Sequence, residues 1–411
     1  MKTLLCLGAG IESVPIIQRV QELDYRAVVV DANPNAPAVK ISDYFLEVSC
    51  YHGDAIIHEM RRVIPYSDVL DGVLCCAVDA PVACAEIAAA LGLPGLSVEA
   101  ARLSSDKIAQ ETRLHAANIP IPYFSQPEQG QWLIHRPAIV KPADSRGGRG
   151  VIRVLSGIEL QRAYNEAAQQ SPTGRVMVEP WLDGPQLSTE SIVQDGRVLF
   201  TAIGLRNYAR LDEFAPYVIE DGFREPFETY DARNPNDYLR ILDEIDRIID
   251  LACAALDWYQ HGAGTVKGDL VIHDGEIVII ELAARLSGGF FASHGHPLAY
   301  GVDFVGEAIK AALGYRCESI YSYQRGYVCQ RYVFPAPDDI GKTVVAIEDV
   351  RAGKIPIECA TWNINPGDVV QPVTCHPRRW GQALATGRTP EEARQRAEAA
   401  VIAMKAGMIL E

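Results

Sequence analysis

The stretch GEIVIIELAARLSGG, residues 275–289, places a carboxylate at the end of an apolar run. The run 277–280 consists of isoleucine and valine, which favours a buried strand. It stops at Glu281, and Arg285 follows four residues later. Glu281 is therefore either a surface residue just beyond a strand or a carboxylate held at the rim of a core.

A second carboxylate, Asp269, lies in the preceding strand of the same expected hairpin. Two carboxylates with neighbouring oxygens suit Mg²⁺. A two-residue loop would pair Asp269 with Ile280 and turn the acids to opposite faces, because side chains alternate along a strand. We predict instead a three-residue loop at 273–275, which pairs Lys267 with Glu281. Lys267, Asp269 and Glu281 then share one face.

A glycine-rich loop lies upstream in AIVKPADSRGGRGVIRVL. Lys141 ends one expected strand, and a second strand follows the loop, so this is not a P-loop, which would continue into a helix. Successive glycines let backbone N–H groups close around phosphate oxygens, and cationic side chains add positive charge. The loop glycines are Gly147, Gly148 and Gly150, and the cations are Lys141, Arg146 and Arg149.

Composition and charge narrow the functional class. A chain of 411 residues suits two or three domains. Its 38 basic and 53 acidic side chains give a net charge of −15, so neither nucleic acid nor an anionic membrane is an expected partner. No apolar segment has the length of a membrane span. The ten cysteines show no C-x-x-C pair, which is typical of buried thiols in a reducing compartment, and we expect a cytoplasmic protein.

The chain divides into three compositional blocks. Residues 1–103 alternate apolar runs with helical patterns, which predicts a Rossmann-like parallel α/β domain. Residues 104–315 mix helices with antiparallel strands joined by the turn signals QDGR and HDGE, and their segment from about 120 to 190 is expected to form a mobile lid lobe. Residues 316–411 are expected to form a small α+β closing domain, whose last helix has Thr389 as its N-cap.

The first block contains an incomplete dinucleotide fingerprint, LCLGAGIES. Gly8 and Gly10 follow a strand and Asp31 ends the next strand, but Ser13 stands where the third glycine belongs. A tight strand-to-helix turn without a nicotinamide explains the pattern as well, because fold does not fix function.

The order of these parts resembles the ATP-grasp superfamily, the carboxylate ligases that include biotin carboxylase, D-alanine:D-alanine ligase and the bacterial L-amino-acid ligases. The resemblance implies an ATP-grasp fold with a Rossmann-like pre-ATP-grasp domain. It assigns the two lysines to phosphate, the glycine loop to the β- and γ-phosphates, and VEPWL to the adenine. Gln186 stands where many relatives have a ribose-binding glutamate. The implied nucleotide residues are Lys107, Lys141, Ser145, Arg146, Gly147, Gly148, Gly150, Glu179, Trp181, Leu182 and Gln186.

The same resemblance assigns Asp269 and Glu281 to Mg²⁺, with Mn²⁺ as an alternative. Ala283 replaces the asparagine that many members use as a further ligand, and the resulting E-x-A-A-R pattern is similar to the amino-acid ligases. The implied catalytic or substrate-binding residues are Arg285, Lys267 and Glu220.

The predicted function is an ATP-dependent ligase that activates a carboxylate as an acyl phosphate and joins it to an amine, with ADP and phosphate as products. Its expected partners are a small carboxylate and an amine, and a homodimer is expected by analogy with the two-lobed relatives. The alternatives are an ATP-dependent carboxylase of the purine-synthesis type and, from another class, an NAD-dependent dehydrogenase. His294 and His296 either line the acceptor pocket or are structural.

Overall fold

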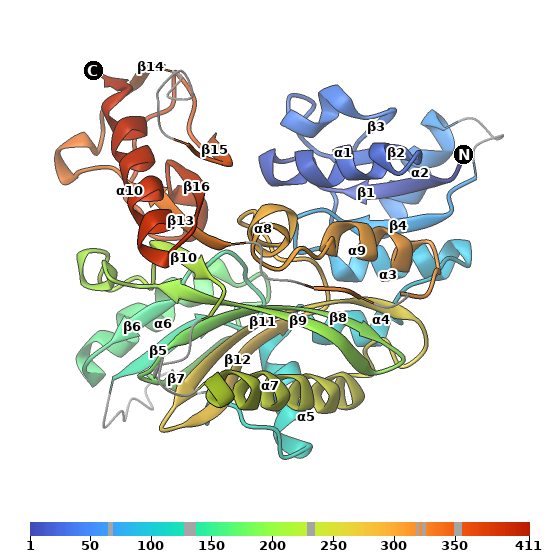
Figure 1. The fold of residues 1–411 in the computed structure, drawn as a ribbon, viewed down its shortest axis with the longest axis horizontal. Coiled ribbons are helices and arrows are strands. Elements are labelled where there is room, and N and C mark those ends of the chain that lie inside the picture. Colours follow the sequence, from blue (N-terminus) through green and yellow to red (C-terminus); the bar gives the residue numbers. More distant parts are fainter. Residues whose placement is uncertain (65–68, 127–136, 228–234, 318–319, 323–325, 349–355) are drawn as a thin grey trace.

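The computed structural model describes residues 1–64, 69–126, 137–227, 235–317, 320–322, 326–348 and 356–411. Figure 1 shows a parallel domain at the N-terminus above a large curved sheet, with a C-terminal lobe beside it. Among the helices in the described ranges, none combines the length and the hydropathy that a membrane span needs. The ten cysteines are all free thiols.

The N-terminal domain is the parallel α/β structure that the sequence predicts. Its four strands are parallel and lie in the order β3-β2-β1-β4. The elements are β1 (Thr3–Leu7), α1 (Val14–Glu22), β2 (Arg26–Asp31), β3 (Tyr44–Glu47), α2 (Gly53–Val63), β4 (Gly72–Cys75) and α3 (Pro81–Leu91).

The incomplete fingerprint forms a self-contained turn between β1 and α1. Gly8 has φ +98°, and a Cβ there would lie 3.0 Å from the Cys76 carbonyl oxygen. The Asp31 carboxylate accepts hydrogen bonds from the N–H groups of Ala9 and Asn33, at 2.9 Å each. Ser13 Oγ donates to the Cys76 carbonyl at 2.7 Å. These residues hold the turn itself together.

Two helices lead from this domain into a small lobe. The lobe is the antiparallel sheet β6-β5-β7 packed against α6. Residues 127–136 of the expected lid lie outside the described residues. The elements are α4 (Val98–Leu103), α5 (Lys107–Ala116), β5 (Ala138–Pro142), β6 (Ile152–Val154), α6 (Gly157–Gln170) and β7 (Val176–Pro180).

An eight-stranded sheet, in the order β12-β11-β8-β9-β10-β13-β16-β15, forms the centre of the molecule. Strands after residue 316 extend this sheet, so the C-terminal segment shares its hydrogen bonding with the central region, while β14 and β17 pair separately. The boundaries expected near residues 103 and 315 stay predictions. The elements are β8 (Gln186–Gln194), β9 (Arg197–Asn207), β10 (Gly222–Glu225), α7 (Pro235–Leu256), β11 (Ala263–His273), β12 (Glu276–Ala283), α8 (His296–Tyr300), α9 (Phe304–Ala312), β13 (Tyr327–Val333), β14 (Val344–Ile347), β15 (Cys359–Trp362), β16 (Gly381–Gly387), α10 (Pro390–Ala406) and β17 (Met408–Leu410).

The helix α10 begins as predicted. The Thr389 side chain accepts a hydrogen bond from the Glu392 N–H at 3.1 Å, and Pro390 occupies the first turn, where its missing N–H costs nothing.

The hairpin of β11 and β12 corrects the predicted loop. His273 pairs with Glu276, so the loop has two residues, Asp274 and Gly275, both with positive φ. Such a turn matches the twist of the flanking strands. The register then shifts, because Leu270 pairs with Ile279 while Asp269 pairs with Glu281.

A β-bulge at Ile280 therefore supplies the extra residue that we had assigned to the loop. The predicted pairing of Lys267 with Glu281 is wrong, because Lys267 pairs with Ala283. The predicted common face is confirmed, since Asp269 and Glu281 are direct partners and Lys267 lies two residues from Asp269.

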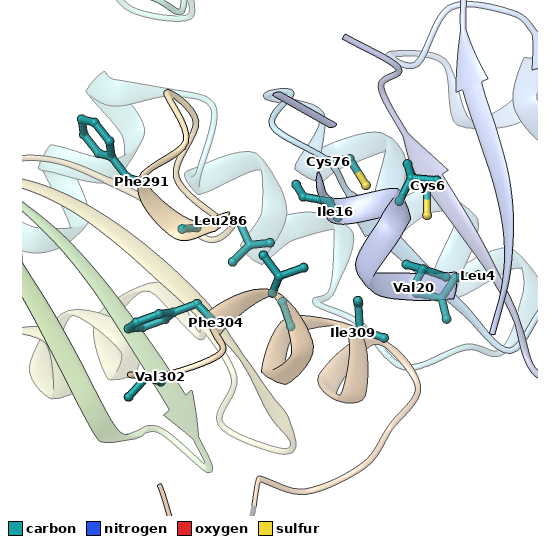
Figure 2. Packing of buried hydrophobic residues seen from close by; sticks show 14 of the residues in the cluster. Leu4, Cys6, Ile16, Val20, Cys76, Leu286, Phe291, Val302, Phe304 and Ile309 are labelled. Atoms are coloured by element: carbon teal, nitrogen blue, oxygen red, sulfur yellow. The ribbon is translucent and has the colours of Figure 1, made fainter. Parts of the chain in front are cut away.

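Each face of the central sheet packs against a different layer. Val266, Leu270 and Leu282 pack with the buried side of α7, and α7 runs along that face in Figure 1. On the other side, α9 joins the sheet to the N-terminal domain. Figure 2 shows Ile309 of α9 pointing toward α1, and Ile309 and Ile16 of α1 belong to one cluster of buried side chains. The polar face of β11 and β12 is thus held below the N-terminal domain.

Candidate active site

The two acids of the hairpin are surrounded by cations. Asp269 Oδ1 lies 2.6 Å from Arg206 Nη1, and its other oxygen pairs with Lys267. Burial by itself raises the pKa of Asp269, but the charges of Arg206 and Lys267 outweigh burial and leave that pKa below its ordinary value. The carboxyl is therefore ionised at neutral pH.

Glu281 is also a buried carboxylate with cationic neighbours. Its Oε1 lies 3.2 Å from Lys107 Nζ. Burial raises its pKa, while Lys107 and Lys267 lower it by more, so the net pKa is reduced.

Two ionised carboxylates on one face offer oxygen ligands to a hard cation, and they fit Mg²⁺ or Mn²⁺. No group of three or more His, Cys, Asp or Glu side chains suited to a metal occurs in the described part of the chain. A cation at Asp269 and Glu281 would therefore complete its coordination with oxygens from bound ligands, such as phosphates.

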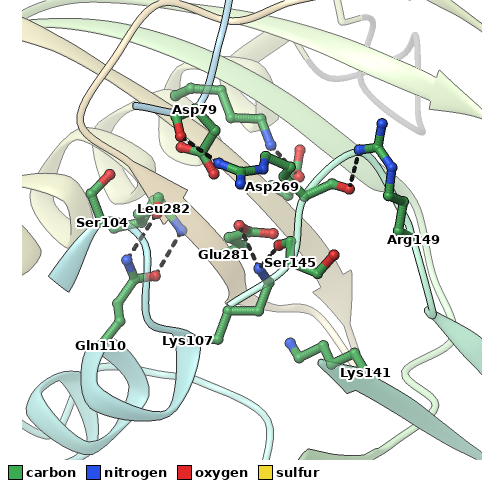
Figure 3. Close-up of polar contacts among 12 residues, drawn as sticks. Asp79, Ser104, Lys107, Gln110, Lys141, Ser145, Arg149, Asp269, Glu281 and Leu282 are labelled. Atoms are coloured by element: carbon green, nitrogen blue, oxygen red, sulfur yellow. Dashed lines mark hydrogen bonds and ion pairs between the residues drawn. The ribbon is translucent and has the colours of Figure 1, made fainter. Parts of the chain in front are cut away.

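The first predicted phosphate lysine bridges the hairpin and the glycine loop. Lys107, at the start of α5, donates to the Ser145 carbonyl at 2.9 Å and approaches Glu281, as Figure 3 shows. The loop turns through Gly147, Gly148 and Gly150, which have φ between +64° and +71°. Only glycine adopts this conformation readily.

The loop packs against the C-terminal segment. His376 N–H donates to the Gly147 carbonyl at 3.0 Å, and a Cβ on Gly148 would lie 3.4 Å from the His376 ring. In this structure the two loop arginines donate hydrogen bonds to backbone carbonyl groups. Arg146 donates to the Asp79 carbonyl at 2.8 Å and stacks on Tyr51, and Arg149 donates to the Arg146 carbonyl at 3.0 Å.

The second predicted phosphate lysine is buried between two carboxylates. Lys141 Nζ lies 2.6 Å from Glu179 Oε1 and 3.3 Å from Glu111 Oε1. The sequence singled out Glu179 for adenine, but here its carboxylate holds Lys141.

The segment after β7 contains the other residues assigned to the nucleoside. Trp181 N–H donates to the Pro137 carbonyl at 2.8 Å, so in this structure that N–H is used within the lobe. Leu182 follows it, and Gln186 opens β8, where it pairs with Val271. The three residues lie on the connection between the small lobe and the central sheet.

The predicted catalytic residues each have an ionic partner. Arg285 Nε lies 3.2 Å from Asp79 Oδ1, which comes from the N-terminal domain. Lys267 pairs with Asp269. Glu220 accepts from Arg206 Nε at 2.8 Å, and the Oε1 of Glu220 is buried without a hydrogen-bond partner in the described structure.

Further charged groups converge here that sequence reasoning missed. Arg379, which follows His376, stacks over the Tyr332 ring at 3.6 Å and donates to the Glu220 carbonyl at 3.3 Å. Glu12 accepts from the Gly289 N–H at 2.8 Å. Burial raises the pKa of Glu12, against the opposing influence of Arg379 and Arg285. Burial and the positive charges of Arg379 and Arg206 hold the pKa of His376 well below its ordinary value.

The two loop histidines have different surroundings. His296 is fully buried and pairs with Glu225. Burial lowers its pKa, but the charges of Glu225 and Glu190 raise it by more. His294 is half-buried and accepts or donates a hydrogen bond with Ser293 Oγ at 3.0 Å. The His296 ring is thus part of the buried interior, whereas His294 stays a candidate for the acceptor pocket.

A signal for one missed residue was present in the sequence. Asp79 lies just beyond β4 at the carboxyl edge of a parallel sheet, where ligand sites usually form. The other missed residues, among them Glu111 in the middle of a helix, lie in no sequence pattern that indicates a functional role. The missed residues are Glu12, Asp79, Glu111, Arg206, His376 and Arg379.

Comparison with known proteins identifies two regions of the chain. Residues 104–289 match an ATP-grasp domain, and residues 342–405 match the L-amino acid ligase C-terminal domain 2.

One curated relative matches almost the whole chain and another matches about a third of it. A formate-dependent phosphoribosylglycinamide formyltransferase from Synechococcus sp. is 28% identical over 416 residues, covering 98% of this chain and 96% of the relative. A D-alanine–D-alanine ligase from Marinobacter nauticus is 32% identical over 139 residues, covering 32% of this chain and 41% of the relative.

Solved structures share the fold along its full length. An L-amino acid ligase from Bacillus licheniformis superposes with a TM-score of 0.76 at 19% identity, covering 100% of this chain and 98% of that one. A phosphoribosylglycinamide synthetase from Anaerococcus prevotii gives a TM-score of 0.73 at 18% identity, covering 100% and 99%. Residues 104–289 thus form an ATP-grasp domain, and the chain as a whole is similar to ATP-dependent carboxylate:amine ligases.

Proposed function

We propose that this ligase joins a carboxylate to an amine of the amino-acid type, through an acyl phosphate made from ATP. The observation that carries the proposal is the convergence of Asp269 and Glu281 with Lys107 below the glycine loop. The match of residues 342–405 to the L-amino acid ligase C-terminal domain supports the amino-acid class.

The proposed nucleotide site lies between the small lobe and the central sheet. Lys107, Lys141 and the loop 145–150 would hold the phosphates, by charge and by backbone N–H groups. The connection 179–186 would hold the nucleoside. When bound at Asp269 and Glu281, Mg²⁺ would neutralise phosphate oxygens during transfer.

The proposed chemistry needs no nucleophilic side chain. A carboxylate oxygen of the substrate attacks the γ-phosphorus, and the bond to ADP breaks. The amine nitrogen then attacks the acyl carbon, phosphate leaves, and the nitrogen loses one proton as the amide forms. Lys267 and Arg285 would stabilise the charge that develops on the transferred group and on the acyl oxygen.

The charged groups at the junction of the domains support a zwitterionic substrate. Arg379 has no carboxylate within ion-pair distance in the described structure, so its free N–H groups suit a carboxylate. Glu12 and Glu220 each present a carboxyl that an ammonium group could pair with.

The proposal also includes a homodimer, because a 2-oxoglutarate carboxylase domain of the same fold was solved as a dimer.

The test is phosphate release from ATP and Mg²⁺ with a panel of carboxylates crossed with amines, followed by mass spectrometry of the amide. Formate and bicarbonate belong in the panel because of the relatives with formyltransferase and carboxylase names. We expect activity with one amino-acid pair or more, lost in Asp269→Asn. Asp274→Asn is the matched control, since Asp274 lies at the exposed tip of the same hairpin.

Phosphate release with bicarbonate alone, and with no amino acid, would favour the carboxylase alternative. Unchanged activity in Asp269→Asn would show that the carboxylate pair is not the site.

A further inference from the structure

Glu111 lies one helical turn after Lys107 on α5. Residues four apart on a helix share a face, so both side chains point from α5 toward the nucleotide site. Lys107 reaches the glycine loop and Glu281, and Figure 3 shows Lys141 projecting into the same space from β5. One face of α5 thus carries Lys107 and, through Glu111, contacts Lys141.

The contact between Glu111 and Lys141 is buried. Glu111 is 2% exposed, Lys141 4% and Glu179 3%. Lys141 Nζ donates to Glu111 Oε1 at 3.3 Å, while Oε2 of Glu111 has no hydrogen-bond partner within the described structure. An unpartnered buried oxygen costs free energy unless a ligand meets it.

Two carboxyl groups around one ammonium group cannot both be ionised cheaply in a dry interior. Burial is the largest cause that raises the pKa of Glu111 to about 9, with the charge of Glu179 adding to it and that of Lys141 opposing it. The pKa of Lys141 is raised as well, because Glu179 and Glu111 outweigh burial. At neutral pH Glu111 is then an uncharged acid, and Glu179 is the counter-ion of Lys141.

We propose that Glu111 is a positioning residue for ATP, which aims the Lys141 ammonium at the phosphates as an uncharged hydrogen-bond partner. Its second oxygen then carries the proton and faces the Glu179 carboxylate, which can accept that hydrogen bond. An ionised Glu111 would instead add a second negative charge beside the triphosphate. This inference rests on the proposed role of Lys141.

The first test is MgATP binding by isothermal titration calorimetry at about pH 7.5, where Glu111 is mostly protonated. Glu111→Gln keeps the uncharged shape and is expected to bind within about twofold of the unaltered protein. Glu111→Ala is expected to bind about tenfold more weakly, since one charge-assisted hydrogen bond is lost. Equal binding by the alanine variant, or equally weak binding by the glutamine variant, would overturn the proposal.

The second test is the pH dependence of the same affinity. The groups that face the Glu111 carboxyl are Lys141 from β5 and Glu179 from β7, and Glu281 from β12 acts on Lys141. Affinity should fall as the pH rises through about 9 in the unaltered protein and stay level in Glu111→Gln. Identical pH curves would refute the uncharged role, and this comparison also decides the matter if Glu111→Ala does not fold.

Leu114→Val is the matched structural control. Leu114 is fully buried on the same helix and packs in the apolar cluster that contains the buried residues of α7, so this variant should lower the melting temperature and leave MgATP affinity unchanged. If Leu114→Val also binds MgATP more weakly, the effect of Glu111→Ala would be explained by loss of α5 stability, and the positioning role would be rejected. Absence of MgATP binding by the unaltered protein would reject the proposed function itself, whereas normal binding with insensitive Glu111 variants would reject only this inference.

Discussion

Lys141→Met should destabilise the fold as well as abolish ATP binding. The position of Lys141 at phosphate, which the family resemblance implies, predicts that removing this lysine abolishes turnover and leaves the fold intact. The structure indicates otherwise, because Lys141 is the buried counter-ion of Glu179 at 2.6 Å. Removing one partner of a buried pair leaves an unpaired charge and costs about 3–5 kcal/mol.

A double variant separates this cost from the loss of ligand binding. Lys141→Met combined with Glu179→Gln removes the unpaired charge, so most of the lost free energy of unfolding should return, to within about 1 kcal/mol. Binding of MgATP should remain absent in both variants, because the ammonium group is gone.

The assay is urea unfolding followed by tryptophan fluorescence, with MgATP titrations on the same samples. Lys310→Met is the control, since its pair with Glu307 is half-exposed and should change stability by no more than about 1 kcal/mol. A single variant as stable as the unaltered protein would refute the counter-ion role. A double variant no more stable than the single one would do the same.

Three further predictions concern other parts of the chain. His296→Gln should lower the free energy of unfolding most near pH 6, below the unfolded imidazole pKa of about 6.5, and progressively less as the pH rises through the raised folded pKa, as urea unfolding at several pH values would show. Gly184→Ala should lower the free energy of unfolding more than Gly275→Ala does in the same assay. Both glycines have positive φ, which costs an alanine about 1–2 kcal/mol. A Cβ on Gly184 would also lie 2.0 Å from the Ile272 carbonyl oxygen, whereas nothing lies within 4 Å of a Cβ on Gly275. ADP with Mg²⁺ at a hundredfold excess over its dissociation constant should stabilise the protein by about 2.7 kcal/mol and raise its melting temperature, whereas a shift with NAD alone would contradict the ligase assignment.

Residue types and their order are sufficient to predict local structure at several points of this chain. The apolar run 277–280 and the turn signal HDGE before it are enough to predict β12 and its hairpin with β11, because continuous β-branched residues favour a buried strand. Thr389 and Pro390 predicted the start of α10 for an equally local reason, the unpaired N–H groups of a first helical turn.

The contacts between these residues depend on how the whole chain folds. The register of the hairpin depended on a bulge at Ile280, which shifts the pairing by one residue and leaves no mark in the sequence pattern. Arg285 pairs with Asp79, which lies 206 positions earlier in the sequence. Arg206 of β9 pairs with both Glu220 and Asp269, although β8 separates β9 from β11 in the sheet. Glu111 could be placed on a helix face, but its pKa depends on burial beside Lys141 and Glu179. Ionisation and ion pairing follow from distance and solvent exclusion in three dimensions, and neither quantity is a property of local sequence.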